Sequence, residues 1–90
     1  MKMYYVYVIK SFKNSRRYVG FTSKNPVERL KEHNRGSNKW SRQNRPFELI
    51  YYEEFTEKEK ARKRERFLKS GKGREFLNKI IKNSNKTFKN

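Results

Sequence analysis

Apolar and aromatic residues alternate with little interruption along "MYYVYVIK" at residues 3–10. Successive side chains of a strand point to opposite faces, and here both alternating sets are mostly apolar. The pattern predicts a central strand that is covered on both faces. The turn-type residues "KNS" at 13–15 separate it from "RYVGFT" at 17–22, so these two stretches predict an antiparallel hairpin. A further β-type stretch, "FELIYYEEF" at 47–55, predicts a third strand.

A helix is predicted after the hairpin, and it ends near Asn34. Asn25 is a favourable N-cap residue, and Pro26 suits the first helical position. Gly36 is well placed to end the helix, because glycine readily adopts the left-handed conformation found there. The side chains expected to face the core are Val27, Leu30 and Asn34.

The remaining sequence predicts a basic loop and two more helices. The polar stretch "RGSNKWSRQNRP" at 35–46 is typical of a loop. Thr56 and Glu59 have the spacing of a capping box, which predicts a second helix from there to about Lys69. The stretch "REFLNKIIK" at 74–82 predicts a third, short helix. The predicted order is therefore ββαβαα, an α+β fold in which helices flank a small three-stranded antiparallel sheet.

The length of the chain is that of one small domain. We assign this domain to residues 1–82 and expect residues 83–90 to form a loose basic tail. No apolar run is long enough to span a bilayer, and the first ten residues lack the features of a signal peptide. Cysteine is absent, which excludes disulfides, thiolate zinc sites and cysteine nucleophiles and fits a cytoplasmic location.

The net charge of the chain narrows the range of binding partners that the protein can have. The chain has 25 Lys and Arg against 9 Asp and Glu, a formal net charge of +16 that is spread along its whole length. A polyanionic partner would relieve the resulting self-repulsion, and nucleic acid is the partner we expect. Two alternatives are a membrane surface and a structural role at the ribosome. Membrane-surface binding would need a continuous bulky apolar helix face, which the sequence does not contain.

One carboxylate lies in line with the apolar side of the second predicted helix. Ala61 and Leu68 are seven residues apart and share a face, and Glu65 lies between them on that face. Glu65 is therefore either paired with a neighbouring arginine or available as a ligand for a divalent cation. Magnesium is often held by only one or two carboxylates together with water and substrate phosphates.

A second set of candidate residues lies on the first predicted helix and on the hairpin. Arg29 and His33 are four residues apart, on a face offset from the expected core stripe. They are either two exposed basic groups or a pair that binds phosphate and moves a proton. Tyr7 and Tyr18 come from the two hairpin strands. Each is either a packed core tyrosine or a phenol that orients or deprotonates a water molecule.

Taken together, these motifs resemble the GIY-YIG nuclease family. The resemblance rests on "YVY" at 5–7, "YVG" at 18–20, "ERLKEHN" at 28–34 and "ARKRERFLK" at 61–69, and it covers about residues 4–78. The chain looks most like the small standalone bacterial members, and it is also similar to the nuclease domain of the structure-selective endonuclease Slx. The departures from the family pattern are Tyr5 in place of the first glycine, and Val6 and Val19 in place of the central isoleucines.

The resemblance implies metal-dependent hydrolysis of DNA phosphodiester bonds. Glu65 would hold Mg²⁺ or Mn²⁺, and Arg29 would neutralise the phosphoryl oxygens. Tyr7 would orient or deprotonate the attacking water, and Tyr18 would assist through its hydroxyl. His33 would relay a proton or hold Tyr7.

Contacts to nucleic acid are expected from Gly20, Lys39, Trp40, Arg42, Arg45 and Asn78. Trp40 has two open interpretations: it stacks on an unpaired base, or it packs down as a lid on the small core. Branched or flap DNA is one candidate substrate, and RNA stays open because no residue separates it from DNA. A protein partner or a homodimer is expected to help choose the target. The alternative function is a catalytically inactive, basic nucleic-acid-binding module.

Overall fold

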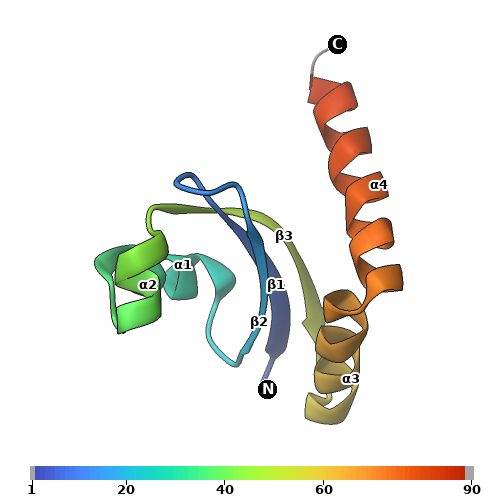
Figure 1. Ribbon diagram of the computed structural model, residues 1–90. Coiled ribbons are helices and arrows are strands. Elements are labelled where there is room, and N and C mark those ends of the chain that lie inside the picture. Colours follow the sequence, from blue (N-terminus) through green and yellow to red (C-terminus); the bar gives the residue numbers. More distant parts are fainter. Residues whose placement is uncertain (1, 89–90) are drawn as a thin grey trace.

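The computed structural model describes the backbone of residues 2–88 and the side chains of residues 2–81. Its elements, labelled in Figure 1, are β1 (Tyr4–Ser11), β2 (Arg17–Thr22), α1 (Pro26–Arg35), α2 (Lys39–Asn44), β3 (Phe47–Phe55), α3 (Lys58–Lys69) and α4 (Gly71–Phe88). The three strands form one antiparallel sheet in the order β2-β1-β3. The α+β class, the three strands and the flanking helices predicted from the sequence are confirmed. Within the described part of the chain, no helix is long and apolar enough to cross a membrane.

Strand β1 lies at the centre of the sheet and is covered on both faces, as its apolar pattern predicted. On one face Val6 and Val8 pack with Ala61, Leu68 and Leu77 of α3 and α4. The other face of β1 carries a second buried cluster, formed by Tyr7, Ile9 and Phe47 beside residues of α1 and α2. Figure 1 shows the result: α1 and α2 lie on one side of the sheet and α3 on the other, while α4 extends beyond the body.

Helix α1 begins and ends as predicted, but its buried face differs from the predicted one. The Asn25 side chain accepts a hydrogen bond from the Val27 backbone at 2.8 Å, and Gly36 ends the helix at a φ of 76°. Val27 is 48% exposed, so its predicted place in the core is wrong. His33 is only 5% exposed, so the expectation that it lies outside the core is also wrong. His33 is buried because α2 and the start of β3 cover the side of α1 on which it lies.

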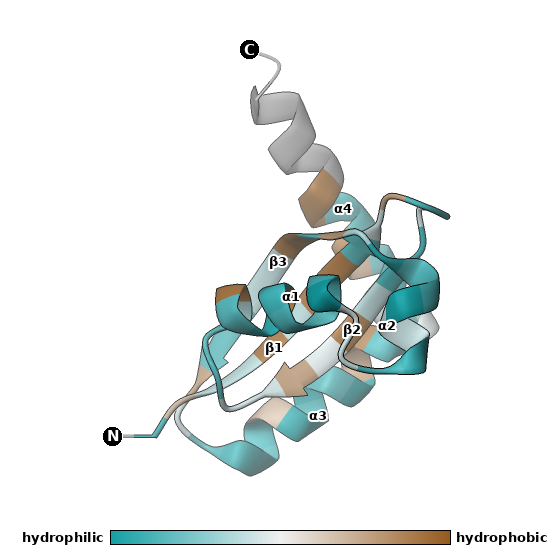
Figure 2. Cartoon of the chain, turned by 90° about the vertical axis from the view of Figure 1, so that its left-hand side faces the viewer, coloured by the Kyte–Doolittle hydropathy of each residue, from teal (hydrophilic) through white to brown (hydrophobic). Residues whose placement is uncertain are grey.

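The predicted loop at 35–46 contains helix α2. The Asn38 side chain caps it by accepting a hydrogen bond from the Ser41 backbone at 2.8 Å. Trp40 is its one large apolar residue, and the rest of its surface is polar, as Figure 2 shows by the teal colour of α2 in front of the sheet. A helix this short and polar owes its place to tertiary contacts, which is why hydrophobic periodicity did not indicate it.

Two further boundaries differ from the predictions. Helix α3 starts at Lys58 after Glu57, without a side-chain cap, so the predicted capping box is wrong. Helix α4 begins at Gly71 and continues to Phe88, so the predicted helix at 74–82 is too short at both ends. Residues 89–90 of the expected tail lie outside the described residues. The division into a domain at 1–82 and a loose tail at 83–90 stays a prediction.

Candidate active site

Tyr7 crosses the edge strand of the sheet at a position where that strand has no side chain. Its residue partner on β2 is Gly20. A Cβ atom placed on Gly20 would collide with the Tyr7 ring and hydroxyl, so glycine is what allows the ring to lie there. The space beside Gly20 is thus occupied by the Tyr7 side chain. A direct contact of Gly20 with nucleic acid stays a prediction.

The Tyr7 hydroxyl meets His33 and, through it, a buried serine. Tyr7 Oη lies 3.0 Å from His33 Nε2, and His33 Nδ1 lies 3.1 Å from Ser41 Oγ. All three side chains are buried, and they come from β1, α1 and α2. The structure therefore brings Tyr7 and His33 into contact. Such a contact is needed if His33 is to relay a proton or hold Tyr7, the roles that the family resemblance implies. Sequence reasoning missed Ser41, whose only signal was the capping residue Asn38 three positions before it.

Arg29 approaches the same hydroxyl and is held by a carboxylate on its own helix. Its Nη1 atom donates to Glu32 Oε1 at 2.6 Å, and Lys24 donates to the other Glu32 oxygen at 2.6 Å. Hydrogen bonds from Lys24 and Arg29 lower the pKa of Glu32 to about 2, so this carboxylate stays charged at any physiological pH. Glu32 therefore fixes the direction of the guanidinium group, which suits Arg29 to binding an anion.

The electrostatics of the site follow from burial and from Arg29. Burial raises the pKa of Tyr7, while the nearby Arg29 cation lowers it and the Glu65 charge raises it. Burial also lowers the pKa of His33, and Arg29 lowers it further. Burial disfavours the charged form of each side chain. At neutral pH the site therefore contains a protonated phenol, a neutral imidazole and a permanent cation.

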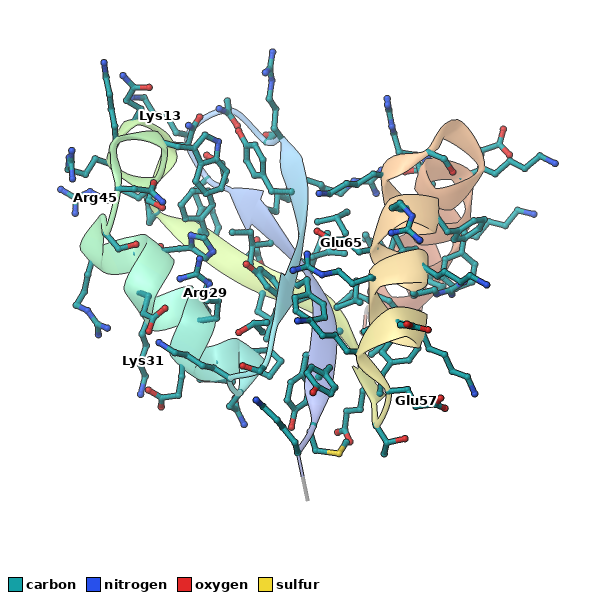
Figure 3. All side chains as sticks on the ribbon, turned by 90° about the horizontal axis from the view of Figure 1, so that it is seen from below. Lys13, Arg29, Lys31, Arg45, Glu57 and Glu65 are labelled. Carbon is teal, nitrogen blue, oxygen red and sulfur yellow. The ribbon has the colours of Figure 1, made fainter. Side chains whose placement is uncertain are left out.

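Glu65 reaches the site from the opposite layer of the structure. Figure 3 shows Arg29 on α1 and Glu65 on α3, with strands of the sheet between the two helices. Ala61 and Leu68 are fully buried, and the Glu65 side chain is 12% exposed, so the predicted shared face is present. Its charge is close enough to act on the pKa of Tyr7.

The two interpretations of Glu65 can now be compared with its contacts. Its carboxylate pairs with Arg62 at 3.2 Å and with Lys69 at 3.0 Å. Both cations are about half exposed and project from the surface of α3, so they can turn away from the carboxylate. The described residues contain no group of three or more His, Asp or Glu side chains that could hold a metal ion. A single carboxylate, once released by its two cations, fits Mg²⁺ or Mn²⁺ only as part of a site that substrate phosphate completes.

A basic cleft of about 710 Å³ runs along the free edge of β2 and contains Tyr7 and His33 in its lining. Its other lining residues are Ile9, Arg16, Arg17, Tyr18, Val19, Gly20, Trp40, Leu68, Lys69, Arg74 and Leu77. Four of these side chains are basic and none is acidic. Arg29 and Glu65 lie outside this lining. The cleft therefore offers positive charge beside the Tyr7 hydroxyl, from a different set of residues than the sequence suggested.

The aromatic residues of the cleft are engaged in contacts within the protein. The Tyr18 hydroxyl donates to Asn44 Oδ1 at 3.2 Å, so the structure directs it toward α2. The Trp40 ring lies 4.6 Å from that of Tyr18 and 5.3 Å from that of Phe47, with His33 also adjacent. This arrangement is the lid that one interpretation of Trp40 required. A catalytic role of Tyr18 and base stacking by Trp40 stay predictions.

The basic residues predicted to contact nucleic acid are spread over the surface. Arg42 donates to the carbonyl of Gly36 at 3.1 Å, and Arg45 donates to that of Arg35 at 3.0 Å. Both therefore cap the C-terminal end of α1, where the helix dipole is negative. Lys39 and Asn78 are exposed on α2 and α4. None of the four lines the cleft, and their contacts with nucleic acid stay predictions.

Comparison with known proteins places this geometry in a family. A model of the GIY-YIG catalytic domain matches residues 3–80. The chain is 40% identical over 68 residues to UPF0213 protein CPE1444 of Clostridium perfringens, covering 74% of this chain and 71% of that protein. It is 38% identical over 71 residues to UPF0213 protein SH2523 of Staphylococcus haemolyticus, covering 78% and 84%.

The fold is also shared with a solved structure. The solution NMR structure of UPF0213 protein BH0048 of Bacillus halodurans superposes with a TM-score of 0.53 at 30% identity, covering 87% of this chain and 84% of that one. The matched family model spans both hairpin tyrosines, Arg29, His33 and Glu65. The chain therefore belongs to the GIY-YIG nuclease family.

Proposed function

We propose that the protein is a metal-dependent endonuclease that hydrolyses phosphodiester bonds of DNA in the cytoplasm. The observation that carries the proposal is the convergence of groups on the Tyr7 hydroxyl. His33 is hydrogen-bonded to it, and the charges of Arg29 and Glu65 both act on its pKa, although they come from opposite sides of the sheet. A phenol, a fixed cation and a carboxylate whose two partners are surface cations support chemistry on a phosphate ester.

Each residue of this group has a chemical task in the proposed reaction. Arg29, held in place by Glu32, neutralises the phosphoryl oxygens as negative charge builds up on them. Tyr7 positions the attacking water and takes up its proton, for which it must first lose its own. Arg29 favours that loss, because its positive charge lowers the pKa of Tyr7.

Glu65 would hold the metal ion, together with substrate oxygens and water. When bound, Mg²⁺ or Mn²⁺ would stabilise the charge that develops on the leaving oxygen. Glu65 would exchange its contacts with Arg62 and Lys69 for this role. The two released cations then remain near the scissile phosphate as additional positive charge.

The proposal predicts metal-dependent cleavage, which gel assays can test. Labelled flap, branched and duplex DNA, and matching RNA, are incubated with the protein in Mg²⁺, Mn²⁺ or EDTA. We expect cleavage of DNA in either metal and none in EDTA. Binding without cleavage of any substrate in both metals would contradict the nuclease proposal and would support a basic binding module. The pattern of products identifies the preferred DNA structure, and light scattering of the active species tests for a homodimer.

The cleft along β2 is the proposed path of the DNA backbone past Tyr7, and this can be tested by charge removal. In the double variant Arg17→Gln/Arg74→Gln, we expect the slope of log Kobs against log[salt] to become shallower by up to about 2, since each lost phosphate contact removes ~0.9 from it. Fluorescence anisotropy with labelled duplex at several salt concentrations measures this slope.

The matched control for this experiment removes the same charge elsewhere. Lys31 and Lys60 lie outside the cleft, and each pairs with a glutamate on its own helix or at its start. Lys31→Gln/Lys60→Gln should leave the slope within about 0.5 of its original value. Equal slopes for the two double variants would mean that DNA does not follow the cleft.

A further inference from the structure

We propose that Ser41 is a positioning residue that fixes His33 in the tautomer protonated at Nε2. His33 then donates a hydrogen bond to the Tyr7 oxygen and does not accept the Tyr7 proton. This inference deepens the proposed function, because it assigns the direction of one hydrogen bond in the same site. The tautomer itself can be measured without any DNA, so it can be tested separately from the nuclease activity.

The position of the Ser41 hydroxyl is fixed by its surroundings. Ser41 is fully buried in α2. Its backbone N–H donates to Asn38 Oδ1 at 2.8 Å, and its carbonyl accepts from the Arg45 N–H at 2.9 Å. Both backbone groups are therefore satisfied, and the side chain is held toward α1. Its Oγ atom lies 3.1 Å from His33 Nδ1, which is the one hydrogen-bond partner that the described residues give this hydroxyl.

The direction of this hydrogen bond follows from counting hydrogens. A serine hydroxyl has one hydrogen to donate, and a neutral imidazole has one N–H donor and one bare nitrogen acceptor. If Nδ1 carried the hydrogen, the Ser41 hydroxyl would accept it and its own buried hydrogen would have no partner among the described residues. Leaving a buried donor unpaired is unfavourable. With the hydrogen on Nε2, it is the Tyr7 hydroxyl hydrogen that has no partner within the protein, but Tyr7 lines the cleft, where water can accept it, whereas Ser41 is fully buried and outside the cleft lining. Ser41 therefore donates to a bare Nδ1, and the imidazole hydrogen is on Nε2.

The Nε2–H group points at the oxygen of Tyr7, 3.0 Å away. Two aromatic rings enclose the imidazole: Trp40 and Phe47 have ring centres 5.4 Å and 5.8 Å from that of His33. Shielding from water strengthens such a hydrogen bond and hinders exchange of the tautomer. The donated hydrogen bond favours the phenolate form of Tyr7. Tyr7 reaches this form when its neutral hydroxyl gives its proton to water, while His33 keeps the proton on Nε2.

The tautomer can be observed directly by NMR, because His33 is the single histidine of the chain. In uniformly ¹⁵N-labelled protein at a pH above the pKa of His33, we expect two-bond correlation spectra to show protonation at Nε2. In Ser41→Ala this preference should weaken to a mixture of both tautomers. The matched variant Ser37→Ala removes an exposed serine hydroxyl before α2 and should keep the wild-type pattern. An Nδ1-protonated ring in the wild type, or an unchanged ring in Ser41→Ala, would overturn the proposal.

The rate of DNA cleavage provides a second test, which distinguishes positioning of His33 by Ser41 from a merely structural role of Ser41. Ser41→Ala should lower kcat about tenfold with an unchanged Kd for DNA, as expected for one weakened hydrogen bond. His33→Gln keeps an amide N–H near the Nε2 position but cannot take up a proton. It should therefore retain more activity than His33→Ala. If His33→Gln is as inactive as His33→Ala, His33 acts as a proton acceptor and the proposal fails.

The two tests also separate this proposal from the nuclease proposal. If the wild-type protein does not cleave DNA at all, the nuclease proposal fails while the NMR spectra still decide the tautomer. If Ser41→Ala does not fold, as judged by circular dichroism, the wild-type spectrum and the two His33 variants remain decisive.

Discussion

Replacing Glu65 by alanine is expected to lower the rate of DNA cleavage about a thousandfold, since metal-assisted charge stabilisation contributes several kcal/mol to such reactions. Glu65 is the carboxylate whose charge reaches Tyr7 from α3, and the described residues offer no cluster of ligands that could replace it. Single-turnover rates in Mg²⁺ and in Mn²⁺ measure the loss, with each metal varied in concentration.

DNA binding should survive this substitution and become slightly tighter. Arg62 and Lys69 lose the carboxylate with which they pair, so both cations, of which Lys69 lines the cleft, become available to phosphate. Glu57→Ala is the matched control: Glu57 lies at the start of the same helix, far along it from Glu65 in Figure 3, and pairs only at the surface with Lys60. Full cleavage by Glu65→Ala would contradict the proposed metal site, and an equal loss in Glu57→Ala would indicate a general effect on α3.

The sheet and the side of α3 that carries Glu65 could be predicted because their patterns are local. Strand β1 has apolar side chains on both faces, and this is the composition that a central strand between two helical layers requires. Glu65 lies between Ala61 and Leu68 on the helix surface whatever the tertiary packing. These features depend on spacing within one element, and spacing can be read from a sequence.

The burial of His33 could not be predicted in the same way. Helical spacing shows which residues share a face, but the elements that cover a face are set by tertiary structure. Helix α2 covers His33 with Trp40 and Ser41, and α2 itself has no hydrophobic periodicity to reveal it. The one local feature of the sequence that indicates α2 is Asn38, since asparagine is a favourable N-cap residue.

The net charge of the chain indicated its function class correctly, but the sequence did not show which basic residues line the cleft. The net charge of +16 agrees with a protein of a nuclease family. Arg42 and Arg45, however, bind carbonyl groups at the end of α1, while Arg17 and Arg74, which the sequence did not single out, line the cleft. Composition gives no information on which side chains face a cleft, because that depends on how β2, α3 and α4 meet.

Replacing Tyr7 by phenylalanine is expected to lower cleavage by a factor of about 10² to 10⁴, the usual contribution of a general base. The phenylalanine ring can still lie over Gly20, so the sheet edge keeps its packing and only the hydroxyl is lost. DNA binding should be unchanged, because Arg29 and the basic cleft remain. Tyr52→Phe is the matched control, since Tyr52 is the residue opposite Tyr7 on β3 and is about half exposed.

The pH dependence of the rate separates a base from a packing residue. Burial raises the pKa of Tyr7 above its ordinary value, so at neutral and mildly alkaline pH only a small fraction of the phenol is deprotonated. That fraction grows about tenfold for each pH unit below the pKa, and the wild-type rate should rise with the same slope. His33 titrates below its ordinary pKa, and Arg29 stays charged, so neither produces this rise. A rate in Tyr7→Phe that still rises tenfold per unit would exclude Tyr7 as the base and would indicate a metal-bound water as the group that titrates.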